Sequence, residues 1–250
     1  MKHPTLDKLH ELKLTGMMQA LQEQSNDEAM YGHLGFEERL GLLLDREADA
    51  QGNRRLTSRL KRANLRQQAC IENIDYRARR NLDKAQMLSL AQCEWVKARH
   101  NILITGPCGV GKSFLACALA HKACLMGYSA QYIRAQRLFE DLAVARGDGR
   151  YMRILGGLAR VNVLIIDDWG LTVLSEAERR DLLEIMEDRH QRQCTIVTSQ
   201  LPMAHWHEAI GNATLADAIL DRLVHNAYRI ELKGESLRKK HAAIDAAANG

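Results

Sequence analysis

The stretch that most constrains this chain is the loop GPCGVGKS at residues 106–113, which fits the pattern G-x-x-x-x-G-K-[ST]. The short apolar run of residues 101–105 precedes the loop and predicts a buried strand. The apolar run from Phe114 to Ala120 follows it and is rich in helix formers. The loop therefore lies where a strand turns into a helix, which is typical of a phosphate-binding P-loop and not of a chance glycine-rich turn.

The residue types in this loop suit phosphate chemistry. Glycines allow positive φ angles, so backbone N–H groups can approach a phosphate, and the next helix adds the positive end of its dipole. Lys112 supplies a charge for the β- and γ-phosphates and is expected to assist catalysis, while the Ser113 hydroxyl is a ligand for Mg²⁺. We therefore predict ATP and Mg²⁺ as cofactors. The residues expected to contact ATP here are Gly106, Pro107, Gly109, Val110, Gly111, Lys112, Ser113 and Phe114.

The most apolar run in the chain, residues 161–166, ends in two aspartates. We expect Asp167 to hold the Mg²⁺ shell and Asp168 to polarise the attacking water. The next predicted strand ends in Thr198, Ser199 and Gln200, and one of these polar side chains is expected near the γ-phosphate. The residues leave open which of the three it is. Because the carboxyl ends of parallel strands meet at one edge of a sheet, all these groups should converge there.

Strand and helix patterns alternate through the rest of the chain, which predicts a parallel sheet covered by helices on both faces. Besides residues 101–105 and 161–166, the predicted strands are 130–133, 195–199 and 228–232. The predicted helices that follow residue 80 are 82–97, 138–145, 172–191 and 215–226, besides the one after the P-loop. Ile71, Ile74 and Tyr76 favour a short extended piece, and the segment 70–100 is a candidate to cover the adenine.

The N-terminal part of the chain is predicted to be helical, with helices over 5–24, 36–50 and 54–68 and a turn at residues 52–53. The third helix is basic, and no acidic residue lies between Asp49 and Glu72. Such one-sided charge favours contact with DNA phosphates over a solvated face or an acidic protein partner. The absence of an aromatic stacking platform favours duplex DNA. The candidate DNA contacts are Arg54, Arg55, Arg59, Lys61, Arg62 and Arg66, of which Arg55, Arg59, Arg62 and Arg66 should share one helix face.

Composition restricts the setting more than the activity. The chain has 250 residues and a formal net charge of +4, which alone does not imply nucleic acid. Neither a membrane span nor a signal-peptide pattern is apparent, and the six cysteines form no C-x-x-C pair. We therefore expect a cytoplasmic protein without a membrane partner. His205 and His207 lack an accompanying cluster and are interpreted as loop residues, not as metal ligands.

Several pieces together resemble one family. Beyond the P-loop, they are VLIIDDWG at 163–170, TIVTSQLP at 195–202, ADAILDRLVHNAYRIEL at 216–232 and GESLRKK at 234–240. With them, nearly the whole chain resembles IstB, the helper ATPase of insertion-sequence transposition, in the DnaC/DnaA-like branch of AAA+ proteins. The resemblance implies an AAA+ ATPase that forms a homo-oligomer on duplex DNA with ATP and assists a transposase.

The resemblance also assigns roles by position. Lys112 and Ser113 match Walker A, Asp167 and Asp168 match Walker B, and Ser199 or Gln200 falls at sensor 1. Two arginines near the end are candidates for a finger supplied in trans and for a charge over the γ-phosphate of the same subunit. The resemblance places Arg222 at the arginine finger and Arg238 near sensor 2, although little chain follows Leu232 for the usual helical lid. AAA+ proteins commonly have Glu where Asp168 stands, so we expect slow hydrolysis that assembly or DNA stimulates.

The predicted organisation is an all-α DNA-binding and assembly domain at 1–68, an α/β P-loop AAA+ ATPase domain at 69–240 and a disordered tail at 241–250. A DnaC-type replicative helicase loader is the alternative function, since it would share the ATPase core. A loader uses its N-terminus to hold a helicase, whereas this N-terminus carries a long basic helix. A small-molecule kinase is disfavoured by the paired aspartates and the polar strand ends.

Overall fold

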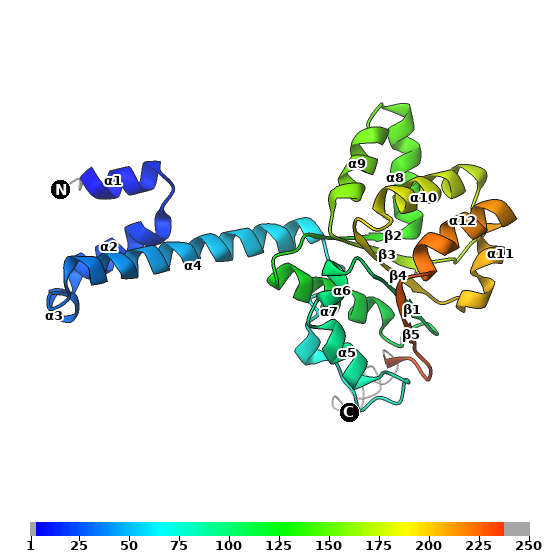
Figure 1. Ribbon diagram of the computed structural model, residues 1–250, viewed down its shortest axis with the longest axis horizontal. Coiled ribbons are helices and arrows are strands. Elements are labelled where there is room, and N and C mark those ends of the chain that lie inside the picture. Colours follow the sequence, from blue (N-terminus) through cyan, green and yellow to red (C-terminus); the bar gives the residue numbers. More distant parts are fainter. Residues whose placement is uncertain (1–3, 238–250) are drawn as a thin grey trace, which may run out of the picture. The chain divides into compact units, whose positions relative to one another are not determined.

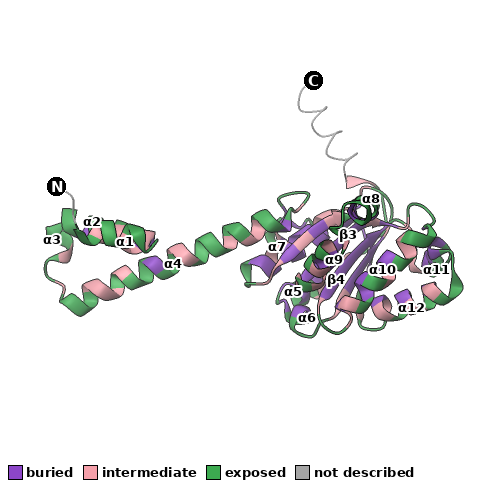
Figure 2. Ribbon diagram, turned by 90° about the horizontal axis from the view of Figure 1, so that it is seen from above, coloured by how far each residue is buried: buried purple, intermediate pink, exposed green. Residues whose placement is uncertain are grey.

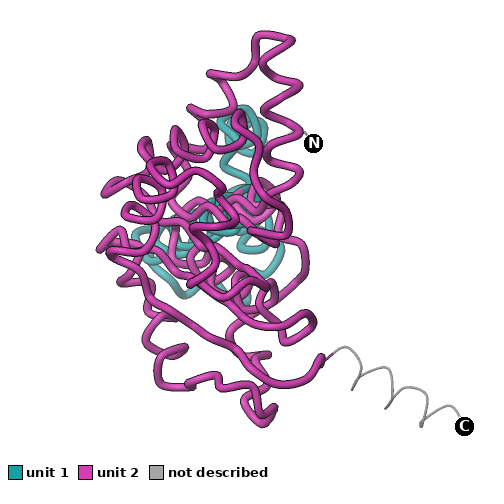
Figure 3. The backbone as a smooth tube through the Cα atoms, turned by 90° about the vertical axis from the view of Figure 1, so that its right-hand side faces the viewer, with its two compact units in different colours: residues 1–58 teal, residues 59–250 magenta. Residues whose placement is uncertain are grey.

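The computed structural model describes residues 4–237, which form two compact units. The first unit ends at Ser58 and the second begins at Arg59 (Figure 3). The predicted domain boundary at residue 68 falls inside the second unit. The predicted tail 241–250 and Arg238 lie outside the described residues.

The first unit is helical, as predicted, but its helices begin and end elsewhere. It contains α1 (Pro4–Glu11), α2 (Thr15–Asn26), α3 (Glu28–Tyr31) and most of α4 (Phe36–Ala63). The single helix predicted over 5–24 is therefore wrong, because the chain breaks at Lys13, which has a φ of 60°. The Glu47 carboxylate accepts hydrogen bonds from the N–H groups of Gly16 (2.7 Å) and Met17 (3.2 Å), and so satisfies donors that a fresh helix start exposes.

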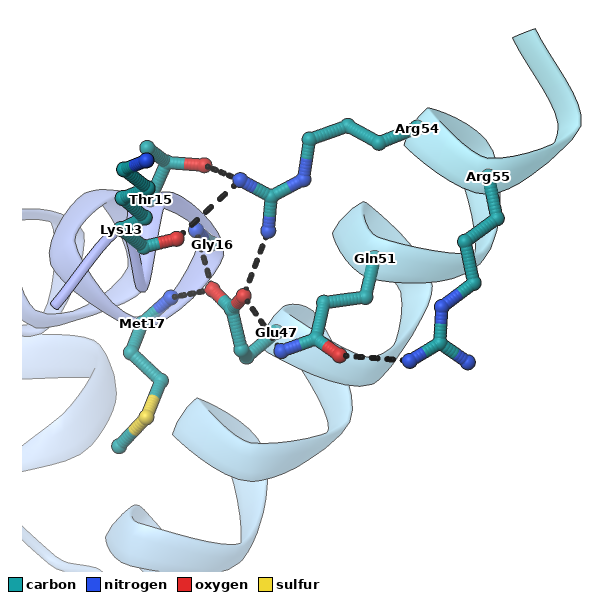
Figure 4. Close-up of polar contacts among 8 residues, drawn as sticks. All are labelled: Lys13, Thr15, Gly16, Met17, Glu47, Gln51, Arg54 and Arg55. Carbon is teal, nitrogen blue, oxygen red and sulfur yellow. Dashed lines mark hydrogen bonds and ion pairs between the residues drawn. The ribbon is translucent and has the colours of Figure 1, made fainter. Parts of the chain in front are cut away.

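The turn predicted at residues 52–53 is also wrong, because α4 continues through it. Gly52 and Asn53 disfavour a helix by about 1 kcal/mol or less each, and tertiary contacts readily outweigh such a preference. Arg54 supplies such contacts, since it donates to Thr15 Oγ1 (3.1 Å) and to the Lys13 carbonyl oxygen (3.2 Å). Within α4, the Glu47 carboxylate also accepts hydrogen bonds from Gln51 (3.1 Å) and Arg54 (2.7 Å) on the two sides of Gly52 (Figure 4). The helix ends at Ala63, before the predicted residue 68, and Asn64 then adopts a φ of 47°.

As the sequence predicted, the second unit is built on a parallel sheet. The sheet has five strands, in the order β2-β3-β4-β1-β5 (Figure 1). Its strands are β1 (Asn101–Thr105), β2 (Ala130–Arg134), β3 (Val163–Trp169), β4 (Cys194–Ser199) and β5 (Ala227–Glu231). The order places β1 and β3 on either side of β4. The loops that follow β1 and β3 therefore meet at the carboxyl edge of the sheet, where a ligand site of an open α/β sheet lies.

Helices cover both faces of this sheet, and Figure 2 shows the buried strands between them. The helices are α5 (Lys84–Leu90), α6 (Glu94–Lys97), α7 (Lys112–Leu125), α8 (Ala135–Gly147), α9 (Tyr151–Arg160), α10 (Glu176–Arg189), α11 (Trp206–Ile210) and α12 (Ala213–Val224). Residues of α8, α10 and α12 share one core with Leu164 and Ile166 of β3. Neighbouring residues of a strand point to opposite faces of the sheet. Helix α7 packs against β2, β3 and β4 but contributes no residue to that core, so it covers the other face.

Three local predictions differ from the structure of the second unit. The helix predicted over 82–97 is split into α5 and α6 at Cys93, which has a φ of 59°. The piece predicted as extended begins with the 3₁₀ turn Ile71–Asn73, and α9 was not predicted. Helix α10 begins at Glu176, because Ser175 and Glu178 cap it reciprocally. None of the helices between residues 4 and 237 is long and apolar enough to cross a membrane.

Candidate nucleotide-binding site

The P-loop connects β1 to α7 and has the backbone geometry that its glycines allow. Gly106, Gly109 and Gly111 have φ angles of 145°, 82° and 98°. A Cβ on Gly106 would lie 2.4 Å from the Leu232 carbonyl oxygen, and a Cβ on Gly111 would lie 2.5 Å from Arg80 Nη1. Any side chain at either position would therefore collide with the surrounding protein as well as strain the backbone.

Lys112 and Ser113 open α7, the helix that follows the loop. Lys112 is buried, and its Nζ donates hydrogen bonds to the carbonyl oxygens of Gly106 and Pro107, both at 2.7 Å. Its ammonium group is thereby held over the loop. The Ser113 hydroxyl donates to the Asp167 carboxylate, whose two oxygens lie 2.8 and 3.0 Å away. The structure thus brings together the P-loop and the acidic end of β3, as predicted.

Asp167 is fully buried and ionised. Burial is the largest influence on its pKa and would raise it, but hydrogen bonds from the hydroxyls of Thr198, Tyr132 and Ser113 and the charge of Arg66 together lower it. A carboxylate beside a serine hydroxyl is an oxygen donor set of the kind that Mg²⁺ prefers. Ser113 and Asp167 therefore fit the cation that the sequence predicted.

Asp168 differs from its neighbour in backbone and exposure. Its φ is 57°, and the pairing of β3 with β4 is irregular between Ile166 and Trp169. The Asp168 N–H donates to Thr198 Oγ1 at 3.2 Å, and its side chain is 29% exposed. The irregularity keeps both carboxylates at one edge of the sheet, with Asp167 buried and Asp168 accessible from a cavity.

This cavity has a volume of about 360 Å³, which lies in the range of pockets for small ligands. The predicted residues that line it are Gly109, Gly111, Lys112, Ser113, Phe114, Asp168 and Gln200. Ser199 is fully buried, and its hydroxyl donates to the Trp169 carbonyl oxygen at 2.7 Å. Of the three polar residues at the end of β4, Gln200 alone lines this cavity, since Thr198 donates to Asp167.

Sequence reasoning missed several residues that line the cavity: Arg66, Gln67, Asn73, Asp75, Arg80 and Leu237, besides Cys108 of the loop. Arg80 is buried, and it donates to the carbonyl oxygens of Val110 (2.9 Å) and Asp75 (3.0 Å). Burial lowers the pKa of its guanidinium. The only sequence signal for Asn73 and Asp75 was their place in the segment expected to cover the adenine.

Arg222 lies at the opposite end of the sheet from the P-loop. It belongs to α12 and donates to the Ala218 carbonyl oxygen (2.7 Å) and to Glu187 (2.9 Å). Asn101, the first residue of β1, donates to the Arg222 carbonyl oxygen at 3.1 Å, whereas the P-loop follows the last residue of that strand. Arg222 therefore does not reach the cavity of its own chain.

The basic residues predicted to bind DNA lie in different surroundings. In the first unit, Arg54 donates to Glu47, to Thr15 Oγ1 (3.1 Å) and to the Lys13 carbonyl oxygen (3.2 Å), while Arg55 reaches only Gln51 at 3.4 Å (Figure 4). Arg54 is thus occupied by a structural contact, and Arg55 is exposed.

In the second unit, Arg59 donates to the Cys124 carbonyl oxygen at 3.1 Å. Arg66 lies beyond the end of α4 and lines the nucleotide cavity, so the prediction that it shares a helix face with Arg55, Arg59 and Arg62 is wrong. Lys61 and Arg62 are exposed, and neither makes a side-chain hydrogen bond or ion pair with a described residue.

The histidines near residue 206 do not form a metal site. His205 lies 3.4 Å from Glu208, and His207 lies 3.4 Å from Asp217. Within residues 4–237, no group of three or more His, Cys, Asp or Glu side chains is placed to hold a metal ion.

The sequence matches the family of IstB-like ATP binding proteins over residues 7–244. A relative from Sinorhizobium fredii (strain NBRC 101917 / NGR234), named as an insertion sequence ATP-binding protein, is 56% identical over 238 residues, which cover 95% of this chain and 96% of that protein. The fold matches the crystal structure of DnaI with a TM-score of 0.56 at 23% identity, and the match covers 66% of this chain and 91% of the chain in that structure. The match to the crystal structure of the DnaC helicase loader has a TM-score of 0.52 at 19% identity, and it covers 66% of this chain and 97% of the chain in that structure.

These two likenesses show the fold, which is that of AAA+ proteins, and the cavity between the P-loop and the paired aspartates suits ATP. The sequence match extends through both compact units and includes every predicted P-loop residue. The chain therefore belongs to the family of IstB-like ATP binding proteins and is an ATPase with an AAA+ fold.

Proposed function

We propose that this chain is an ATP-dependent DNA-binding regulator that assembles on duplex DNA and assists a transposase in DNA transposition. The single observation that carries the proposal is the cavity in which Lys112, Ser113 and Asp168 converge beside the buried Asp167. This arrangement belongs to a nucleotide-hydrolysing site, and the insertion-sequence relatives supply the biological setting.

In the proposed reaction, the chain's residues orient ATP and water in the cavity. Ser113 and Asp167 would hold Mg²⁺, which neutralises phosphate charge when bound. Lys112 binds the β- and γ-phosphates. Gln200, which follows β4 and lines the cavity, is the polar residue that can contact the γ-phosphate. Asp168 orients the attacking water, but its side chain is one carbon shorter than that of the usual glutamate, so basal hydrolysis is slow.

Arg222 cannot reach its own cavity, so we propose that it serves as an arginine finger in the cavity of a neighbouring copy. Hydrolysis would then depend on assembly. Of the six basic residues predicted to bind DNA, Arg54, Arg59 and Arg66 are engaged in contacts within the chain. The other three, Arg55, Lys61 and Arg62, are exposed and are proposed to contact DNA phosphates. Such contacts carry no base identity, and binding should be weakly sequence-selective.

A DnaC-type helicase loader is the second candidate function, favoured by the fold likeness to DnaI and to the DnaC loader. The neighbouring gene discriminates between the two, because an insertion-sequence helper should be encoded beside a transposase and a loader beside replication genes.

The proposal is tested with the transposase encoded beside this chain, in a strand-transfer assay on a target duplex. We expect product formation to rise when the chain and Mg·ATP are both present, and Lys112→Ala to abolish that rise. Equal product with and without the chain, while the transposase is active on its own, would contradict the proposed role.

A further inference from the structure

Arg66 makes a contact that neither the P-loop nor the DNA interpretation explains. Its Nη1 lies 3.3 Å from Asp167 Oδ2 and 3.7 Å from Asp168 Oδ2. All three residues belong to the second unit. The Arg66 side chain is 32% exposed and lines the same cavity as Lys112 and Ser113. A guanidinium group therefore lies at the acidic end of β3, beside the cavity proposed to hold the nucleotide.

We propose that Arg66 recognises the γ-phosphate of ATP in its own chain, and that its guanidinium passes from the two aspartates to that phosphate when Mg·ATP binds. The inference rests on the proposed function, since it requires ATP in this cavity. It assigns to the segment just after α4 a role that the P-loop, the sensors and the arginine finger do not cover.

Charge is the first reason for this transfer. Asp167 is the carboxylate that would hold Mg²⁺, and a guanidinium 3.3 Å from it carries the same sign of charge as the cation. The two are attracted to one carboxylate and repel each other. The γ-phosphate offers Arg66 a new acceptor of the kind that a planar guanidinium binds well, with two parallel hydrogen bonds.

The second reason is that Asp167 has hydrogen-bond partners besides Arg66. Three hydroxyl groups donate hydrogen bonds to its carboxylate, from Ser113, Tyr132 and Thr198. A buried carboxylate without any partner would be costly. When the guanidinium leaves, the three hydroxyl groups still satisfy Asp167, so this cost does not arise. The contact with Arg66 is an ion pair, and it comes from a partly exposed side chain.

The third reason is the backbone that carries Arg66. Helix α4 ends at Ala63, and residues 64–70 form no helix or strand. Such a segment can adjust its φ and ψ angles at lower cost than a helix can. Lys112, in contrast, is fixed at the start of α7, and besides the γ-phosphate it meets the β-phosphate, which ADP shares with ATP. Loss of Arg66 should thus affect ATP more than ADP, whereas loss of Lys112 should affect both.

The test measures the affinities of fluorescent ATP and ADP analogues, each with Mg²⁺, in the full chain without DNA. We expect Arg66→Ala to weaken Mg·ATP binding roughly 10- to 100-fold, as loss of charge-assisted hydrogen bonds does, and Mg·ADP binding by less than about twofold. Arg66→Lys keeps the charge but not the paired geometry, so its ATP affinity should lie between the two. The matched control is Arg77→Ala, which removes an exposed arginine that does not line the cavity.

Hydrogen exchange of residues 64–70 gives a readout that does not involve hydrolysis. In the wild type, exchange should differ between the Mg·ATP and Mg·ADP complexes, and Arg66→Ala should remove the difference. Equal weakening of both nucleotides by Arg66→Ala, or unchanged affinities, would overturn the inference while leaving the proposed function intact. If the wild type and Lys112→Ala bound ATP equally weakly, the proposed function itself would fail.

Discussion

At the scale of single residues, the two adjacent aspartates of β3 have opposite environments and therefore different expected roles. Asp167 is fully buried among hydroxyl donors, whereas Asp168 lies at the cavity with a partly exposed side chain. We predict that Asp168→Asn binds Mg·ATP with nearly wild-type affinity but releases phosphate at least about 100-fold more slowly, as expected for loss of a group that orients and deprotonates water. Phosphate release at saturating Mg·ATP, compared with the dissociation constant, checks this. Wild-type turnover by Asp168→Asn would remove that role from Asp168.

The residue scale also shows where sequence reasoning stops. Lys112, Ser113 and the two aspartates could be predicted because their chemistry is tied to local strand and loop patterns. Arg66 and Arg80 could not, since nothing in their own neighbourhood indicates which carbonyl or carboxylate they meet. The choice of Gln200 over Ser199 likewise required knowing that the Ser199 hydroxyl is bonded to the Trp169 carbonyl oxygen.

At the scale of elements, Glu47 fixes the start of α2 to the middle of α4. Its side chain is 6% exposed and pairs with Arg54 at 2.7 Å. Burial, the largest influence, would raise its pKa, but hydrogen bonds from Gln51, Met17 and Gly16 and the charge of Arg54 together lower it below its ordinary value of 4.5. The ionised form is therefore favoured by folding. Its stabilising contribution is fully present above about pH 4.5 and is lost as the pH falls through the lower folded-state pKa.

We predict that Glu47→Gln lowers the free energy of unfolding of the first unit by about 1–3 kcal/mol at neutral pH, since it leaves buried donors poorly satisfied. The difference from the wild type should shrink as the pH falls below 4, an approximate limit set by the ordinary carboxyl pKa. Hydrogen exchange of residues 15–58, recorded across a denaturant series, measures the free energy of unfolding of the two proteins at each pH. Glu37→Gln, an exposed change in the first turn of the same helix, is the control and should be nearly neutral. Equal effects of both variants would contradict the role given to Glu47.

The basic end of α4 supplies the DNA prediction. Lys61→Ala with Arg62→Ala should weaken binding to all duplexes alike and reduce the slope of log affinity against log salt by about 0.9 for each lost phosphate contact. Basal hydrolysis without DNA should be unchanged. Affinity across a salt series tests this, with Lys8→Ala/Lys97→Ala as a control that removes two exposed charges elsewhere. An unchanged slope in the Lys61/Arg62 variant would place the DNA on other residues.

Element boundaries illustrate a second limit of prediction. The parallel sheet, its P-loop and its acidic strand end could be predicted from the hydrophobic runs and from the glycines and aspartates that follow them. The continuity of α4 could not, because Gly52 and Asn53 locally favour a turn. The contacts that support the helix there, from Gln51 and Arg54 to Glu47 and from Arg54 to Thr15, cannot be read from the sequence pattern. The break at Lys13 has the same origin, since Glu47 satisfies the N–H groups that the break exposes.

At the scale of the whole molecule, the arginine finger predicts how copies cooperate. Arg222→Ala should keep nucleotide affinity and lose the hydrolysis that assembly stimulates. Mixing it with Lys112→Ala subunits should partly restore hydrolysis. At a mixed interface, the Arg222→Ala subunit supplies an intact cavity and the Lys112→Ala subunit supplies an intact arginine finger. Phosphate release across mixing ratios, with mixed assembly verified by labelled subunits, measures the rescue. Absence of rescue at every ratio would count against a finger in trans.

The central claim is that ATP in this cavity controls assembly on duplex DNA. Its most direct test is the mass distribution of the protein on a duplex in solution, recorded with Mg·ATP, with Mg·ADP and without nucleotide. We predict complexes of many subunits with Mg·ATP only, and none with the Lys112→Ala variant under any condition. Complexes of the same mass in all three nucleotide conditions, or in the Lys112→Ala variant, would contradict the account.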